Sequence, residues 1–381
     1  MKRIAPYAIA LLLAGLLWPA PGQTAPEPCF IGFDVGSSGV RAGSSLSPKT
    51  VRGKIDYLGD VWQDNRIDLT NEESVAAFVS LAAELGLKGC LGLAGGYSAW
   101  RHAMTKGDPA VVATTLAMFR KRTGVLFFVI PQEVEGEYGY LAAHLALGDR
   151  LTTPFILDIG GGSLQIAGKR SGWGSALGKN AWRKLFCEQI KQASEPACPP
   201  NPVGTEATRQ AASLLAPHLD EARNRIGSGI GITAVSPMVV HGIHPILSFL
   251  AANNPEIRDG TDLHGFSRKA LAAAIRQLAD KDDAALLTIL NNCIGKDGQP
   301  VCQTTHVSTF VTDMLLLHTL LEGLAIDRIQ VGEADITNVP GILADSRPIK
   351  WSEHYDCYLQ RLRNDGVVAF LSDPATCPGR P

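Results

Sequence analysis

The sequence carries FDVGSSGVR at residues 33–41 and LDIGGGSLQ at residues 157–165. In each segment a short apolar strand pattern ends in an aspartate, Asp34 or Asp158, and then enters a glycine-rich turn and a second extended segment. Because the later segment restarts the order of the earlier one, we predict a weak internal repeat with a boundary near residue 150.

Strand and helix patterns alternate around both turns. Further strands are predicted at residues 90–94, 125–130 and 328–331, and helices at residues 74–87, 110–122, 138–147 and 267–279. This order is typical of the α/β class, and 381 residues are enough for two domains. We therefore predict domains at residues 28–150 and 151–345, followed by a C-terminal tail at residues 346–381.

The N-terminus has the pattern of a signal peptide. Lys2 and Arg3 precede an apolar run over residues 9–18, and small residues follow at positions 20 and 22. The run falls short of the ~20 residues that span a bilayer, so an anchoring helix is the weaker interpretation. We expect residues 1–22 to be removed and the protein to be periplasmic or secreted, with no stable membrane anchor.

Composition and charge narrow the class of protein further. Hydrophobic residues make up 45% of the chain and charged residues 19%, which is typical of a globular protein. Without residues 1–22 the chain keeps 33 of its 35 basic residues and all 37 acidic ones, a formal net charge of −4. This balance disfavours binding to a nucleic-acid duplex.

Eight cysteines in an exported chain favour disulfides, since no Cys-x-x-Cys or Cys/His spacing of a zinc site occurs. Proximity in sequence suggests three pairs and leaves Cys29 and Cys90, which begin two strands that would be adjacent and parallel. The sequence alone does not fix this connectivity. The suggested pairs are Cys29–Cys90, Cys187–Cys198, Cys293–Cys302 and Cys357–Cys377.

The two glycine turns are candidates for binding phosphate, because glycine lets backbone N–H groups approach an anion closely. An aspartate at the end of a buried strand needs a partner, and Mg²⁺ or Ca²⁺ is a reasonable one for Asp34 and Asp158. The serines of the turns can bind phosphate or only stabilise their own turns. The candidate phosphate-binding residues are Gly36, Ser37, Ser38, Gly39, Arg41, Gly160, Gly161 and Gly162.

Hydrolysis of a phosphate ester or anhydride also needs a group that orients water. Residues 132–137 place three carboxylates between a predicted strand and a predicted helix, and one of them can be that base. Glu137 is better explained as an acid near a helix N-terminus. Arg101, which we expect in a loop after the strand at 90–94, and Arg41 can each contact phosphate or simply lie on the surface.

At these residues the chain resembles the Ppx/GppA family of exopolyphosphatases and guanosine pentaphosphatases, within the superfamily of actin, Hsp70 and the sugar kinases. Residues 33–41 look like its first phosphate motif and residues 157–165 like its second. Glu135-Gly136 stands where the family has its catalytic Glu, and Arg101 matches the family's arginine. The end of the chain, residues 323–343, is similar to the family's closing helix, strand and turn.

Other details resemble the ecto-apyrases. These are Ser37-Ser38-Gly39 with Arg41, the run at residues 135–140, and Gln165 where Ppx/GppA proteins usually have Glu. Val134 also interrupts an acidic run that both families often continue. An amide at position 165 coordinates and orients water but brings no charge.

The resemblance implies two ribonuclease-H-like domains, of the actin-like ATPase type, that flank a cleft. It implies attack of water, held by Glu135 with Gln165 and Ser163, on the terminal phosphorus of polyphosphate or a nucleotide, with Arg101 as a helper. Three alternatives stay open: an apyrase-like nucleotide hydrolase, a kinase of the same superfamily, and a non-catalytic periplasmic protein that binds phosphate polymers or nucleotides. The kinase is disfavoured by Glu135-Gly136 and by export away from cytosolic ATP.

Overall fold

The computed structural model describes residues 29–37, 39–55, 67–86, 89–193, 198–235, 246, 248–250, 252, 263–293, 307–332 and 336–378. The predicted signal peptide at residues 1–22 lies outside these ranges, as do Ser38 and Cys302.

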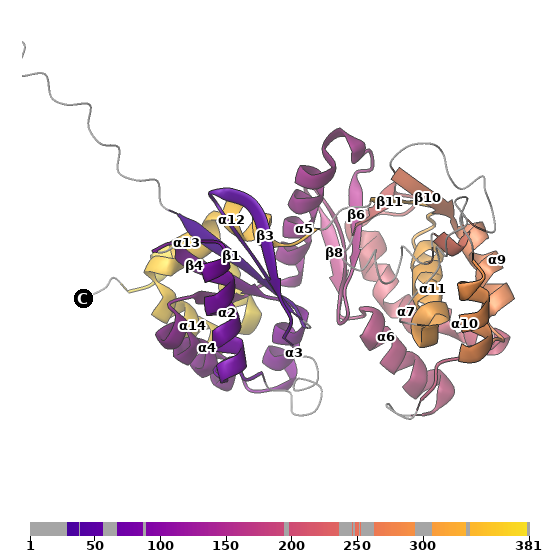
Figure 1. Ribbon diagram of the computed structural model, residues 1–381, viewed down its shortest axis with the longest axis horizontal. Coiled ribbons are helices and arrows are strands. Elements are labelled where there is room, and N and C mark those ends of the chain that lie inside the picture. The colour runs from indigo at the N-terminus through magenta and orange to yellow at the C-terminus, as the bar shows by residue number, and fades with distance from the viewer. Residues whose placement is uncertain are drawn as a thin grey trace, which may run out of the picture.

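The first half of the chain forms a mixed sheet in the order β3-β2-β1-β4-β5 (Figure 1). Strand β1 pairs antiparallel with β2 and parallel with β4, and β5 continues the parallel side. The strands are β1 (Phe30–Val35), β2 (Val40–Ser44), β3 (Ser47–Gly53), β4 (Leu91–Gly96) and β5 (Leu126–Val129). The helices of this half are α2 (Glu72–Glu84), α3 (Ser98–Lys106) and α4 (Pro109–Thr123).

The second half repeats this arrangement. Its sheet has the order β10-β11-β9-β6-β7-β8, so that β6, β7, β8, β9 and β11 correspond to β1 through β5. The antiparallel and parallel pairings match as well, so the predicted internal repeat is present as two equivalent sheets. The strands are β6 (Phe155–Ile159), β7 (Leu164–Gly168), β8 (Gly172–Ser175), β9 (Ile232–Ala234), β10 (Leu263–Ser267) and β11 (Arg328–Gly332).

The helices of the second half pack around the apolar helix α11. Of the 17 residues of α11, 11 are buried, among them Phe310, Met314 and Leu317, and they form one core with strands β6, β7 and β11. Helix α7 has two arginines, Arg223 and Arg225, in its last turn, where cations suit the helix dipole. The helices are α6 (Lys179–Phe186), η2 (Cys187–Lys191), α7 (Thr205–Ile226), α9 (Arg268–Leu278), α10 (Asp283–Asn291) and α11 (Val307–Gly323).

Helix α5 (Gln132–Leu147) joins the halves and is followed by η1 (Gly148–Arg150). Figure 1 shows α5 between the two sheets, and its residues Ala142, Ala143 and Leu147 pack on Ile156 of the second sheet. The helix starts directly after Pro131, earlier than its predicted start at residue 138. The carboxylates of residues 132–137 therefore lie in the first turns of a helix and not before it.

Helix α3 also departs from the sequence-based expectation. The loop expected around Arg101 is wrong, because residues 98–106 are helical. The segment lacks Gly and Pro, and its buried Ala99, Trp100, Ala103 and Met104 recur at helical spacing. Arg101 thus projects from a fixed helix.

After β11 the chain returns to the first half. Helix α12 (Val339–Ala344) packs on β1 and α5, although the sequence pattern assigned these residues to the second domain. Helices α13 (Ser346–Glu353) and α14 (Tyr355–Asp365) follow, then the short helices η5 (Gly366–Leu371) and η6 (Pro374–Thr376). Trp351, Tyr355 and Phe370 belong to the core of the first half, because their large apolar side chains fill space beside β5.

The C-terminal helices also close the edge of the first sheet. The hydroxyl of Tyr355 accepts a hydrogen bond from Phe127 N (3.0 Å) and donates one to Phe127 O (2.8 Å). The hydroxyl of Tyr358 accepts from Val129 N (2.8 Å). Two phenols therefore satisfy backbone groups that a further strand would otherwise pair.

Disulfides link segments in both halves. Cys29–Cys90 joins the starts of the parallel strands β1 and β4, Cys187–Cys198 closes a short loop, and Cys357–Cys377 ties α14 to the end of the chain. These are three of the predicted pairs. The first follows from the parallel register, which places Phe30 beside Leu91 and so brings the preceding residues together.

Candidate active site

A cleft of about 130 Å³ lies where the carboxyl ends of β1 and β6 meet. The predicted residues that line it are Asp34, Gly36, Ser37, Arg41, Glu135, Asp158, Gly160, Gly161, Gly162 and Ser163. Arg101 lines a larger adjoining cavity of about 940 Å³, which shares Ser98, Gly162 and Ser163 with the cleft. Gly39 and Gln165 are in neither lining, and Ser38 lies outside the described residues.

The two glycine turns have the same hydrogen bonding. Gly36 N donates to Gly39 O (2.9 Å), and Gly160 N donates to Ser163 O (2.8 Å). These N–H groups close their turns and are not free for a ligand. In the part of the chain that the structure describes, no backbone hydrogen bond engages the amides of Ser37, Gly161 and Gly162, which are the turn donors left to bind an anion.

The turns also lie close to each other across the cleft. A Cβ built on Gly162 would come within 2.3 Å of Ser98 Oγ, and one built on Gly161 within 3.6 Å of Ser37 Oγ. Glycine at 162 leaves room for Ser98, the first residue of α3, to lie against the second turn. Helix α6 supports the second turn from behind, because Lys179 N and Asn180 N donate to the carbonyls of Gly160 and Gly161.

Asp34 is buried at 3% exposure and is held by two groups. Its Oδ2 accepts from Asn338 N (2.9 Å) and lies 3.7 Å from Arg41 NH1. Burial raises the pKa of Asp34, and the Arg41 guanidinium and Asn338 N–H oppose that rise. Arg41 Nε is buried, and no described residue pairs with it, so this N–H is left to donate to a bound anion.

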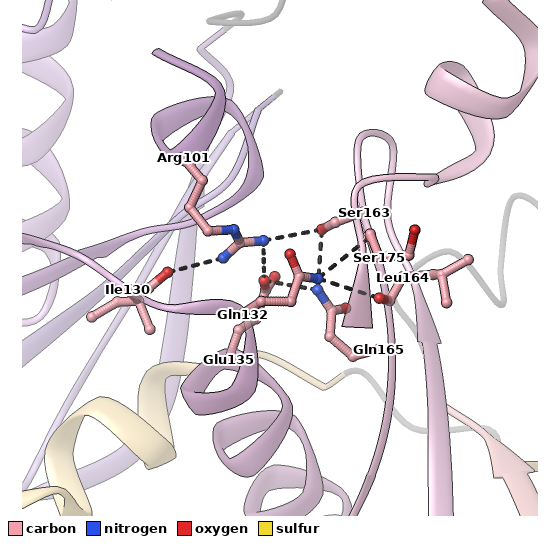
Figure 2. A network of polar contacts seen from close by, with 8 residues as sticks. All are labelled: Arg101, Ile130, Gln132, Glu135, Ser163, Leu164, Gln165 and Ser175. Carbon is pink, nitrogen blue, oxygen red and sulfur yellow. Dashed lines mark hydrogen bonds and ion pairs between the residues drawn. The ribbon is translucent and has the colours of Figure 1, made fainter. Parts of the chain in front are cut away.

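Glu135 stands at the centre of a polar network (Figure 2). Its Oε2 accepts from Arg101 NH2 (2.6 Å) and from Gln165 Nε2 (2.8 Å). Among the described residues, Oε1 has no hydrogen-bond partner. Burial raises the pKa of Glu135 above the usual glutamate value, and Arg101 opposes part of the rise. A fixed carboxylate with one free oxygen and a raised pKa is suited to hold and deprotonate water.

Ser163 connects this network to the second turn. Its Oγ accepts from Gln165 Nε2 (3.1 Å) and, more weakly, from Arg101 NH2 (3.4 Å). Because both bonds use the serine as acceptor, its own proton remains available for an oxygen in the cleft.

Arg101 braces Glu135 and makes a longer contact, 3.4 Å, with Ser163 at the end of the second turn. Besides the bond to Glu135, its NH1 donates to Ile130 O (3.0 Å), so the guanidinium spans from the end of β5 to the start of α5 (Figure 2). Gln132 adds a second tie, from α5 to the carbonyls of Leu164 and Ser175. These contacts fix the base relative to both halves of the molecule.

Asp34 and Asp158 fit Mg²⁺ better than Ca²⁺. Asp34 and Asp158 line the same cleft, while the described residues contain no group of three or more His, Cys, Asp or Glu placed around one metal. Mg²⁺ commonly takes one or two carboxylates and keeps several waters, whereas Ca²⁺ takes about six to eight oxygen ligands. The donor set therefore fits Mg²⁺ held chiefly through water.

Two residues of the cleft gave no usable signal in the sequence. Asn338 lies 304 positions from Asp34, and its contribution is a backbone N–H, which every residue type but proline has. Tyr97 lies between the predicted strand at 90–94 and Arg101, and no sequence pattern marks it as a residue of the cleft. Burial raises the pKa of Tyr97 well above its usual value, and the charges of Asp34 and Glu135 add to the rise.

By fold and site, the molecule is an α/β protein whose two ribonuclease-H-like domains each contribute an aspartate and a glycine turn to a shared cleft. Solved Ppx/GppA proteins have this fold. A Ppx/GppA family member of Aquifex aeolicus matches with a TM-score of 0.56 at 16% identity, over 83% of this chain and 96% of that chain. An exopolyphosphatase of Cytophaga hutchinsonii matches with a TM-score of 0.53 at 15% identity, over 83% and 96%.

Sequence comparisons reach less far. No family model matches the chain. An uncharacterized protein of Streptomyces coelicolor is 31% identical over 176 residues, or 44% of this chain and 51% of that protein. The chain thus matches about half the length of this curated relative. The predicted resemblance to Ppx/GppA proteins is confirmed for the fold. Separately, none of the described helices is long and apolar enough to cross a membrane.

Proposed function

We propose that the chain is an exported phosphoanhydride hydrolase of Ppx/GppA type, which releases terminal phosphate from polyphosphate or from substrates like guanosine pentaphosphate. The observation that carries this proposal is Glu135, whose Oε2 is fixed by Arg101 and Gln165 while Oε1 is left for water, in a cleft lined by both glycine turns.

The residues divide the reaction between them. Glu135 holds a water and takes its proton as the oxygen attacks the terminal phosphorus. The bond from that phosphorus to the bridging oxygen breaks, and the rest of the substrate leaves with that oxygen. The amides of Ser37, Gly161 and Gly162 and the hydroxyl of Ser163 donate to the phosphoryl oxygens, which stabilises the charge that develops there. Arg101 keeps the carboxylate in place and does not contact the phosphate.

Asp34 and Asp158 would hold Mg²⁺ through its water ligands. When bound, Mg²⁺ neutralises phosphate oxygens and makes the terminal phosphoryl group more easily attacked. Both aspartates lie at the ends of equivalent strands, so the two domains would hold the ion between them. This arrangement supports one metal site shared between the halves.

The adjoining cavity favours a phosphate chain as the substrate. The groups that line it include the cations Lys106 and Lys184, with one acid, Glu188, 4.0 Å from Lys184. Arg101, also in the lining, is paired with Glu135, and burial lowers the pKa of His102. None of these lining residues is Phe, Tyr or Trp, the side chains on which a nucleobase usually stacks. A chain of phosphates that leaves the cleft past Gly162 and Ser163 would meet cations, whereas a base would find no aromatic platform.

An apyrase-like activity remains the second candidate function. The cross-strand partner of Asp158 is the neutral Gln165, while Asp34 in the equivalent position faces Arg41. A neutral amide beside the proposed base is one of the apyrase-like features of the sequence.

Export itself is supported by the disulfides, because such bonds persist mainly in oxidising compartments.

One experiment distinguishes these functions. The mature, oxidised protein is offered polyphosphate, guanosine pentaphosphate, ATP and ADP with Mg²⁺ or Ca²⁺, and released phosphate is measured. We expect turnover of polyphosphate with Mg²⁺ and its loss in Glu135→Gln. Turnover of ATP and ADP alone would identify the apyrase-like enzyme, and tight binding of polyphosphate without turnover would identify a non-catalytic binding protein.

A further inference from the structure

Tyr97 combines complete burial with an unsatisfied hydroxyl. The residue follows β4 directly and precedes α3, and its side chain is 2% exposed. Its hydroxyl is buried and has no hydrogen-bond partner among the residues that the structure describes. Such a group is uncommon in folded proteins, since a buried hydroxyl without a partner destabilises the fold by about 1–3 kcal/mol.

The neighbouring strand is shaped to admit this hydroxyl. Tyr97 folds back over β4, and a Cβ built on Gly95 would lie 2.8 Å from the phenolic oxygen, so any larger residue at 95 would displace it. Gly95 is the register partner of Asp34 on β1. The phenol therefore lies over β4, beside the strand that carries Asp34.

Tyr97 also lines the same cleft as Asp34 and Glu135. Packing alone does not explain the hydroxyl, because phenylalanine has the same ring and would fill the space without the unsatisfied oxygen. Because Tyr97 lines the cleft, a molecule bound there is the candidate partner for this hydroxyl. In the proposed reaction Ser163 and the turn amides donate to the phosphoryl group, whereas Glu135 alone would hold the attacking water.

We propose that the Tyr97 hydroxyl donates a hydrogen bond to the attacking water, making Tyr97 a positioning residue for the reaction. The inference rests on the proposed hydrolytic function. The water then gives one proton to Glu135 Oε1, accepts a bond from Tyr97 through one lone pair, and directs the other lone pair at phosphorus. Two fixed contacts orient the nucleophile where the carboxylate alone would leave it free to rotate.

The test compares Tyr97→Phe with Tyr355→Phe. Both changes remove one buried hydroxyl from the first domain, but that of Tyr355 is paired with the backbone of Phe127. For Tyr97→Phe we expect kcat to fall about tenfold, with KM within twofold of the original and the thermal midpoint unchanged or raised. For Tyr355→Phe we expect a lower thermal midpoint and an unchanged kcat.

Three results would overturn the inference. They are an unchanged kcat in Tyr97→Phe, a raised KM with unchanged kcat, which would put the contact on the substrate, and a lowered thermal midpoint, which would make the hydroxyl structural. If the unmodified protein turns over none of the four phosphate substrates, the proposed function itself fails. An active unmodified protein with an equally active Tyr97→Phe variant refutes only the role of Tyr97.

Discussion

Replacing Gln165 with glutamate places a second carboxylate beside that of Glu135, the proposed base. Gln165 Nε2 now donates to Glu135 Oε2 over 2.8 Å, so Gln165→Glu replaces an attraction with two like charges about 4 Å apart. At an effective dielectric constant near 20, two unit charges at that separation repel by about 4 kcal/mol. Both carboxyls therefore cannot ionise freely, and the pair retains a proton to higher pH than Glu135 does alone.

The sign of the effect on stability follows from this retained proton. The folded variant binds more protons than its unfolded chain above about pH 4, the usual range of glutamate. The unfolding free energy of Gln165→Glu should therefore equal that of the unmodified protein at acid pH and become lower than it as the pH rises. At neutral pH we expect a deficit of roughly 2–4 kcal/mol without metal, which Mg²⁺ reduces.

The assay is urea unfolding at several pH values, with kcat/KM measured over the same range. Gln165→Leu is the control, since it removes the same hydrogen bond without adding charge. We expect the acidic limb of kcat/KM to move to higher pH in Gln165→Glu but not in Gln165→Leu. A stability difference between the two variants that does not change with pH would refute the reasoning, because it would show that charge repulsion is not the cause.

Four further outcomes follow from the geometry. Arg101→Met leaves Glu135 buried without its cation and should lower the unfolding free energy by roughly 3 kcal/mol at neutral pH, and by less in acid, as urea titration will show. Because burial raises the pKa of Glu135, kcat/KM of the unmodified protein should fall with decreasing pH before the usual glutamate range is reached. Replacing Cys29 and Cys90 with serine opens a loop closed across 61 positions and should lower unfolding free energy by about 4 kcal/mol. Asp158→Asn should raise the Mg²⁺ concentration for half-maximal rate about tenfold or more, measured by metal titration of phosphate release.

The sequence determines much of the fold because its signals are local. An aspartate at a strand end followed by glycines predicts both turns, and the structure places them in equivalent positions of two matching sheets. The proximity of Cys29 and Cys90 follows from the same reasoning on parallel strands. The residues with strong local patterns, Asp34, Asp158 and Glu135, all line one cleft.

The remaining features depend on contacts between distant segments. Asn338 reaches Asp34 through a backbone N–H, for which no side-chain pattern exists. The sequence predicts Arg101 in a loop after the strand at 90–94, whereas residues 98–106 form a helix that buries Trp100 in the core of the first half. The role of Tyr97 depends on what its hydroxyl lacks, and a missing contact is not visible until the surrounding residues are placed.

Tyr355 and Tyr358, which cover the edge of β5, protect the protein against aggregation with its own copies. An unpaired strand edge is a template on which another chain can add a strand and start an aggregate. Tyr355 and Tyr358 occupy that edge with side chains that offer no continuing backbone ladder. A chain cut before α14 would therefore expose β5 together with the apolar surface around Phe128, and it would tend to precipitate even if the candidate cleft formed normally.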